Sequence, residues 1–318
     1  MTAGLAVTAA ACSSEKPGEV AKDGSVTIKH VFGETKIPGP PKRVVSAGYS
    51  DQDDLLALGV VPVAVTNWFG DQPFGVWPWA LPKLGAAQPV VLDLSNGIQI
   101  DQIAACKPDL IVATNAGMDA DTYTKLSAIA PTVAQSGQDA FFEPWKDQAT
   151  TIGQAVFKDA EMRTLISGLD DKFVNAGKNN PSFSGKKVFL VRGAFIGDAV
   201  QITPAGWRTD FLTQMGFVIG DGIDNYIDGG GNRAAALVPR DRVASVLDAA
   251  DALIWTTESD EEQAALLADP TFAQLKATKT NRNVLTGKDL SGAITFATVL
   301  SYALVADRLP PLIAKVLT

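Results

Sequence analysis

The sequence predicts an α/β fold of two lobes, because two parts of the chain repeat one pattern of elements. The parts cover residues 42–114 and 186–256. Each begins with a basic step and a short apolar run, continues through a helical segment, and ends with an Asp before another apolar run. Such alternation is typical of parallel strands covered by helices. Parallel sheets bind ligands at the carboxyl ends of their strands, so we expect a ligand cleft between the lobes. Two α/β domains without a shared cleft are the alternative.

The length and composition are consistent with this prediction. A chain of 318 residues corresponds to about two domains, and a hydrophobic content of 46% can form a sizeable core. The net charge of −8 argues against a nucleic-acid partner, because a basic patch would supply most of that affinity. No apolar run approaches the roughly 20 residues of a membrane span. We therefore expect neither nucleic-acid binding nor a transmembrane segment.

We place the first lobe at residues 23–158. Gly59 and Pro131 end two of its helices, since Gly favours a helix end and Pro cannot continue a helix. Residues 67–98 are irregular and aromatic, so this segment either covers a core or lines a binding site. Strands are predicted at residues 26–31, 42–46, 60–65 and 109–114, and helices at 51–58, 101–107 and 121–129.

A helical segment connects the two lobes. Residues 143–178 show only helical spacing, and 159–176 form a helix long enough to cross between lobes. We place the connecting helix at 159–181 and the second lobe at 182–318. Because a helical connector is stiff, we expect little hinge closure.

The two cysteines have different environments. Cys12 follows three alanines and precedes a polar segment, a pattern that resembles the cleavage site of bacterial lipoproteins, in which this thiol carries lipid. We therefore expect residues 1–22 to be a signal remnant and a tether that anchors the protein outside the cell membrane, with a plain flexible N-terminus as the alternative. Cys106 lies on the apolar face of a predicted helix, so we expect a buried thiol and no disulfide.

Three stretches of the chain carry a family resemblance. Residues 43–65, 100–133 and 266–290 resemble the solute-binding proteins of ABC importers for iron–siderophore, haem and cobalamin. The second stretch contains the family's KPDLI strand and its YxKLsxIAPTV helix almost intact. The resemblance implies two Rossmann-like lobes joined by a long rigid helix. It also implies a monomeric extracytoplasmic protein that delivers a ferric siderophore to an ABC permease. Haem or cobalamin is the alternative ligand.

An enzyme is the second alternative, in the form of an α/β enzyme that uses a cleft carboxylate. His30 is the only histidine and lies far from the repeated parts, which argues against a Ser–His–Asp triad and most zinc sites. Residues 229–231 are glycines without the Lys-Ser/Thr of a phosphate loop. We therefore expect no catalytic residue, no direct metal ligand and no cofactor. Haem would require an axial ligand such as Tyr49 or Tyr226.

The ends of the predicted strands identify candidate ligand-binding residues. Aromatic faces offer apolar contact to a bulky chelate, and guanidinium groups offer charged donors to its oxygens. By the resemblance, Arg192 matches a basic position of family members that bind anionic siderophores. The alternative places Phe195 and Trp255 in the core and Arg208 in a surface ion pair. The candidates are Tyr49, Trp68 and Asn115 in the first lobe and Arg192, Phe195, Trp207, Arg208 and Trp255 in the second.

The resemblance also implies a docking surface for the permease. In the family, one acidic residue on each lobe pairs with arginines of the permease. The matching positions here are Asp119 and Asp121 in the first lobe and Asp241 in the second. The family commonly has Glu at these positions, which is one methylene longer. The alternative is that Asp121 and Asp241 are helix N-caps.

Overall fold

The computed structural model describes residues 16–228 and 235–317. Cys12, the predicted lipidation site, lies outside the described residues, as do Gly229, Gly230 and Gly231. Within these two ranges, no helix combines the length and apolar character that crossing a membrane requires.

The first lobe contains a five-stranded sheet in which every pair of neighbours is parallel, with the strand order β5-β4-β3-β6-β7. An antiparallel hairpin of β1 (Val26–His30) and β2 (Gly33–Ile37) precedes it. The sheet strands are β3 (Val44–Ser46), β4 (Ala64–Thr66), β5 (Val90–Leu92), β6 (Leu110–Ala113) and β7 (Thr132–Ala134). The helices are α1 (Asp51–Ala57), α2 (Leu81–Leu84), α3 (Ile100–Ala105), α4 (Ala120–Ser127) and α5 (Trp145–Ala155).

The second lobe contains a seven-stranded mixed sheet. Its main strand order is β11-β12-β9-β8-β13-β14, and β10 pairs with β8. The strands are β8 (Lys187–Ile196), β9 (Ala199–Thr203), β10 (Val218–Ile219), β11 (Ile227–Asp228), β12 (Ala235–Pro239), β13 (Ala252–Thr256) and β14 (Asn283–Leu285). The helices are α7 (Asp210–Gln214), α8 (Val243–Leu247), α9 (Asp260–Ala268), α10 (Pro270–Gln274), α11 (Lys276–Lys279), α12 (Gly287–Phe296) and α13 (Val299–Leu317).

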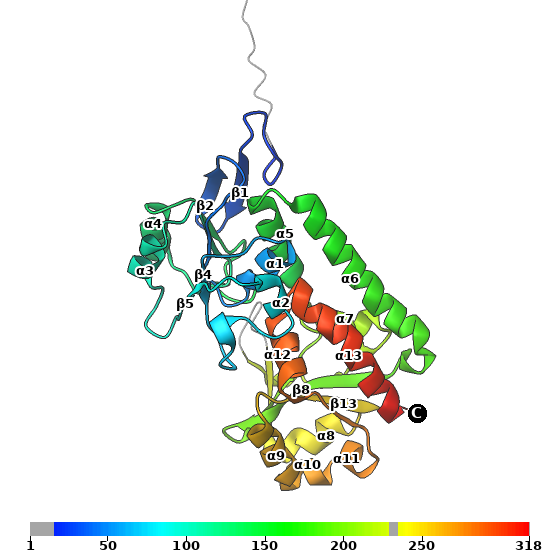
Figure 1. Ribbon diagram of the computed structural model, residues 1–318. Coiled ribbons are helices and arrows are strands. Elements are labelled where there is room, and N and C mark those ends of the chain that lie inside the picture. The colour runs from blue at the N-terminus through cyan, green and yellow to red at the C-terminus, as the bar shows by residue number, and fades with distance from the viewer. Residues whose placement is uncertain (1–15, 229–234, 318) are drawn as a thin grey trace, which may run out of the picture.

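Helix α6 (Asp159–Asn179) extends from the first lobe to the second, and α13 lies beside it (Figure 1). The prediction of a long connecting helix from residue 159 is confirmed. Rings of Phe173 on α6 and Tyr302 on α13 are 6.0 Å apart, and both belong to one buried cluster. That cluster also contains Leu55 of the first lobe and Phe211 of the second. The two lobes therefore share a hydrophobic core.

Local features of both sheets differ from what the sequence indicated, partly because strands of three residues give weak sequence signals. Strands β5 and β7 have three residues each and were not predicted. Strand β8 continues to Ile196, because Leu190 to Ile196 pair antiparallel with β9 around a β-bulge. Arg192 and Phe195 therefore lie within β8 rather than after a strand.

Candidate functional site

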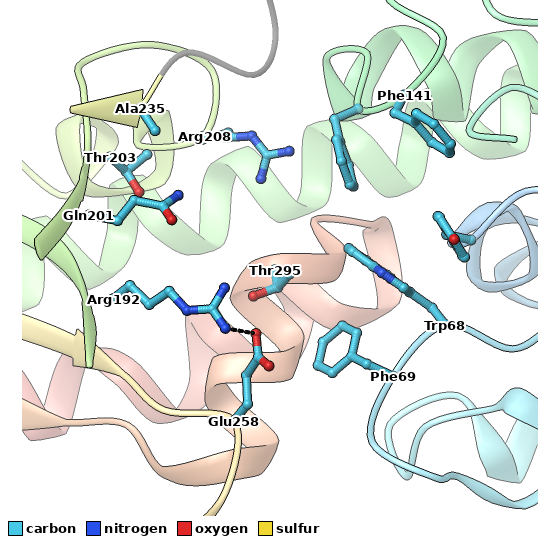
Figure 2. Close-up of a pocket in the computed structure, with 12 residues that line it drawn as sticks. Trp68, Phe69, Phe141, Arg192, Gln201, Thr203, Arg208, Ala235, Glu258 and Thr295 are labelled. Atoms are coloured by element: carbon cyan, nitrogen blue, oxygen red, sulfur yellow. Dashed lines mark ion pairs between the residues drawn. The ribbon is translucent and has the colours of Figure 1, made fainter. Parts of the chain in front are cut away.

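A cavity of about 630 Å³ lies between the two lobes (Figure 2). Tyr49 and Trp68 reach it from the segments that follow β3 and β4, as expected for the carboxyl edge of a parallel sheet. Aromatic rings form the wall on the side of the first lobe, and polar side chains form the opposite wall. The lining residues are Tyr49, Trp68, Phe69, Phe141, Phe142, Arg192, Gln201, Thr203, Arg208, Ala235, Glu258 and Thr295.

The aromatic wall is a set of rings in mutual contact. The Tyr49 ring stacks on Trp68 at a centroid distance of 5.2 Å and on Phe141 at 5.7 Å. Trp68 meets Phe69 edge-on at 4.8 Å. Offset and edge-on pairs are favoured by the ring quadrupoles, and they limit the orientations each ring can take. The wall therefore offers a broad, pre-formed apolar surface.

Two residues behind the wall hold Phe141 and Phe142 in place. The backbone N–H of Phe142, which has a φ of 61°, donates to Oδ1 of Asn115 at 3.0 Å. Gly117 has a φ of 65°, and a Cβ added there would lie 2.0 Å from Cζ of Phe141. Asn115 is 2% exposed and also donates to Ser50. The expected ligand contact of Asn115 is therefore corrected: its buried amide positions Phe142 and does not line the cavity.

Arg208 enters the opposite wall from the turn before α7. Its guanidinium lies 4.6 Å from the ring centroid of Trp207 and 4.8 Å from that of Phe142. Cation–π contacts of this kind orient the planar group. Burial lowers the pKa of Arg208, yet a guanidinium stays protonated at neutral pH. Arg208 therefore brings a positioned positive charge to the cavity.

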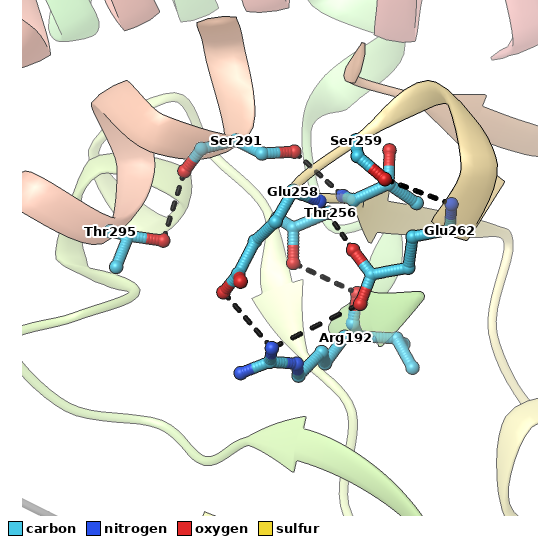
Figure 3. Close-up of polar contacts among 9 residues, drawn as sticks. Arg192, Thr256, Glu258, Ser259, Glu262, Ser291 and Thr295 are labelled. Carbon is cyan, nitrogen blue, oxygen red and sulfur yellow. Dashed lines mark hydrogen bonds and ion pairs between the residues drawn. The ribbon is translucent and has the colours of Figure 1, made fainter. Parts of the chain in front are cut away.

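Arg192 lies in the cavity wall as a member of an ion pair (Figure 3). Its Nη2 is 3.0 Å from Oε1 of Glu258 and 3.9 Å from Oε1 of Glu262. Glu258 follows β13 and also lines the cavity. Glu258 was not among the residues predicted from the sequence, although it lies two residues after the end of β13, where ligand contacts are expected.

Besides Asn115, three more of the expected ligand contacts do not line the cavity. Trp255 is 1% exposed, packs in the core of the second lobe, and donates from Nε1 to Asn283. The guanidinium of Arg240 lies over the Phe195 ring, 3.5 Å from the ring centroid. Trp207 packs against the main core and supports Arg208. The expectations for Phe195 and Trp255 are corrected, because alternate side chains of a strand point to opposite faces and a strand end alone does not select the face. Trp207 lies in the turn before α7, and the expectation is corrected because its ring packs on the core side of that turn.

Comparison with known proteins identifies the family. A family model described as periplasmic binding protein matches residues 44–290. This chain belongs to the periplasmic binding protein family. A crystal structure of a periplasmic solute binding protein from Mycobacterium smegmatis str. MC2 155 is similar over 93% of this chain and 100% of that chain, with 63% identity and a TM-score of 0.87. The match confirms the two-lobed fold.

Two curated relatives come from Bacillus subtilis (strain 168). The lipoprotein YhfQ is 30% identical over 67% of this chain and 64% of its own length. YfiY, named a probable siderophore-binding lipoprotein, is 31% identical over 57% of this chain and 55% of its own length. The chain thus spans less than two thirds of either relative. These matches are consistent with an extracytoplasmic location for this binding protein.

The acidic residues expected to contact a permease lie outside the cavity lining of this binding protein. Asp119 caps α4 by accepting the Thr122 N–H at 2.8 Å, a hydrogen bond that lowers the pKa of Asp119. Asp121 and Asp241 are exposed and pair with Lys125 at 2.7 Å and with Arg242 at 3.4 Å. Neither is an N-cap, since Asp119 holds that position in α4 and Arg242 holds it in α8. The alternative of capping is therefore wrong for Asp121 and Asp241.

The part of the chain that the structure describes holds no group of three His, Cys, Asp or Glu side chains suited to a metal ion. His30 is buried and bonds Thr35 at 2.9 Å within the first hairpin. Tyr226 packs against the core of the second lobe and does not line the cavity. Burial raises the pKa of Tyr49, which opposes the tyrosinate form used in haem ligation.

Buried carboxylates of α1 connect the first lobe to the start of α13. Oδ2 of Asp53 accepts from Trp79 Nε1 and from Thr298 Oγ1, both at 2.7 Å. Oδ2 of Asp54 accepts from Gln148 at 2.9 Å. Burial raises the pKa of Asp53 to about 6 and raises that of Asp54 as well. These contacts hold the chain just after α12, which carries Thr295 into the cavity.

Proposed function

We propose that this protein captures a ferric siderophore outside the cell membrane and delivers it to the permease of an ABC importer. The observation that carries the proposal is the cavity between the lobes, with an aromatic wall facing a polar wall that contains Arg192 and Arg208. A ferric chelate has the matching chemistry, because an apolar ligand framework surrounds a polar set of oxygens. The similarity to YfiY supports the same ligand class.

The geometry suggests how the chelate would lie. Rings of Tyr49, Trp68 and Phe141 would contact its carbon framework through apolar burial. Arg208, oriented by its aromatic neighbours, would donate hydrogen bonds to chelate oxygens. The iron in this proposal is cargo wrapped in its chelator, so the protein supplies no direct metal ligand.

The proposal includes a location and a partner. Lipid on Cys12 would anchor a monomeric protein at the outer face of the membrane, with residues 16–22 as part of the tether. Asp119, Asp121 and Asp241 would contact arginines of the permease. Their exposure and their absence from the cavity lining support separate surfaces for binding and delivery. The family consists of solute-binding proteins, and we propose that this member likewise performs no catalysis.

Tryptophan fluorescence titration tests the proposal. Trp68 lines the cavity, so a bound ferric chelate should quench its emission in a saturable titration. Ferric trihydroxamate, tris-catecholate and citrate chelates form the ligand panel. The gallium complex of a binding chelator is the matched control, because it has the same shape but should quench far less. A Trp68→Phe variant should bind with reduced quenching amplitude.

Two results would contradict the proposal. One is the absence of binding by every ferric chelate of the panel. The other is tight binding of haem with a tyrosinate-type spectrum that disappears in Tyr49→Phe. That second result would assign the cavity to haem, since Tyr49 is the cavity-lining side chain best suited to ligate it.

A further inference from the structure

The cavity contains a carboxylate where the ligand class would lead one to expect only cationic and neutral donors. Glu258 lines the cavity, and its Oε1 forms an ion pair with Nη2 of Arg192 at 3.0 Å. We propose that Glu258 determines the charge preference of the site and selects neutral or cationic ferric chelates over polyanionic ones. This inference rests on the proposed function and specifies its ligand class.

Local hydrogen bonds hold Glu258 at the cavity (Figure 3). Its backbone N–H donates to Oε2 of Glu262, and the N–H of the preceding Thr257 donates to Ser291 Oγ at 2.7 Å. Ser259 caps α9 by accepting the Glu262 N–H at 3.1 Å. Because the N–H groups of Thr257 and Glu258 are both bonded, the backbone that leads to the Glu258 side chain is constrained. The ion pair with Arg192 then holds the carboxylate at the cavity.

The charges of the described lining residues indicate whether Glu258 favours anionic or cationic chelates. Two arginines and one glutamate line the cavity, so Glu258 lowers the sum of their formal charges from +2 to +1 and weakens the attraction for anionic ligands. Glu258 neutralises much of the field of Arg192, and Arg208 is the other arginine of the lining. A chelate with several negative charges would meet repulsion at Glu258. A chelate with an ammonium group would gain an acceptor there, while Arg208 bonds its oxygens.

The ligand class that fits is a ferric chelate of low net charge with a hydrogen-bond donor at one end. A ferric trihydroxamate with a terminal amine has this chemistry. A ferric tris-catecholate has the opposite charge and no such donor. The proposal therefore favours the hydroxamate class over the catecholate class.

A matched pair of ligands isolates the effect of charge. Ferrioxamine B carries a terminal ammonium group, and its N-acetylated form is neutral with the same iron coordination. Ferric citrate and a ferric tris-catecholate extend the series to anionic chelates. Dissociation constants would be measured for the wild-type protein, Glu258→Gln and Glu261→Gln. The last variant makes the same charge change on α9 at an exposed residue outside the cavity lining.

We expect wild-type protein to bind the ammonium form more tightly than the acetylated form. Glu258→Gln should reduce that ratio by about tenfold, the effect of one unit charge at roughly 6 Å with an effective dielectric of about 40. The same variant should bind the anionic chelates more tightly, and Glu261→Gln should keep the wild-type ratio. Circular dichroism and thermal melting would verify the fold of each variant.

The failures of the two proposals are distinguishable. Binding with an unchanged ratio in Glu258→Gln, or an equal change in Glu261→Gln, would overturn the role of Glu258 and leave the proposed function intact. Tightest binding of the tris-catecholate by wild-type protein would also overturn it. Absence of binding by every chelate would overturn the proposed function and this inference together.

Discussion

Asp53→Asn should stabilise this protein at neutral pH, although it removes a buried carboxylate that ties α1 to α13. Asp53 is fully buried, and one oxygen accepts from Trp79 and Thr298. Its other oxygen has no hydrogen-bond partner among the described residues. An asparagine can place its carbonyl oxygen where Oδ2 accepts both bonds. The substitution therefore keeps the contacts and removes the buried charge.

The size of the effect follows from the pKa of Asp53, which burial raises from 3.8 to about 6. Between these values the folded state binds more protons than the unfolded state, so the free energy of unfolding falls as pH rises through this window. A difference of about 2 pKa units corresponds to about 3 kcal/mol. Asp51, raised to about 6, and Glu143, raised to about 7, act in the same direction.

Urea denaturation at about pH 5 and about pH 7.5 measures the prediction. Wild-type protein should be less stable at the higher pH. Asp53→Asn should gain up to about 3 kcal/mol there and show a smaller difference between the two conditions. The gain should be larger if Asp54, whose pKa is raised partly by the Asp53 charge, is relieved as well. Asp121→Asn removes the same formal charge at an exposed residue and serves as the control.

Two outcomes would refute this reasoning. Asp53→Asn could be less stable than the wild type at about pH 7.5, which would show that the charge itself strengthens the contacts with Trp79 and Thr298. Alternatively, the variant could keep the full wild-type difference between the two pH values. That result would show that ionisation of Asp53 does not contribute to the pH dependence of the free energy of unfolding.

Gly117→Ala should lower the free energy of unfolding by about 1–2 kcal/mol, because residue 117 has a left-handed backbone conformation. It should also weaken ligand binding, because the added Cβ would displace the Phe141 ring. An unchanged dissociation constant would show that this ring is not part of the site. Arg192→Ala should weaken an anionic chelate by about 1.5–3 kcal/mol in a fluorescence titration, because a charged donor is lost. An unaltered dissociation constant would place Arg192 outside ligand contact. Replacing both Asp121 and Asp241 with Ala should leave ligand affinity within about threefold while import by the reconstituted transporter falls sharply. Either single change should do less, since exposed ion pairs contribute about 0–1 kcal/mol each. Normal import by the stably folded double variant would show that Asp121 and Asp241 are not needed for docking to the permease.

The sequence predicted the two-lobed arrangement of this protein, although not strands β5 and β7 or the antiparallel strands of the second sheet. Repeated apolar runs indicated two α/β lobes, and helical spacing from residue 159 indicated the connector found as α6. The strand-end rule also located Tyr49 and Trp68 at the cavity. These predictions succeed because they depend on local periodicity and on where a parallel strand ends, which are properties of nearby residues.

The chemistry of the polar wall was decided only by tertiary structure. Arg192 and Glu258 meet because β8 and β13 are neighbours in the sheet, a pairing between residues far apart in the chain. Trp255 has a strand-end position similar to that of Glu258, yet its side chain packs in the core. Local sequence patterns locate a residue along its strand. Strand pairing and the direction of each side chain from the sheet decide whether that residue reaches the ligand.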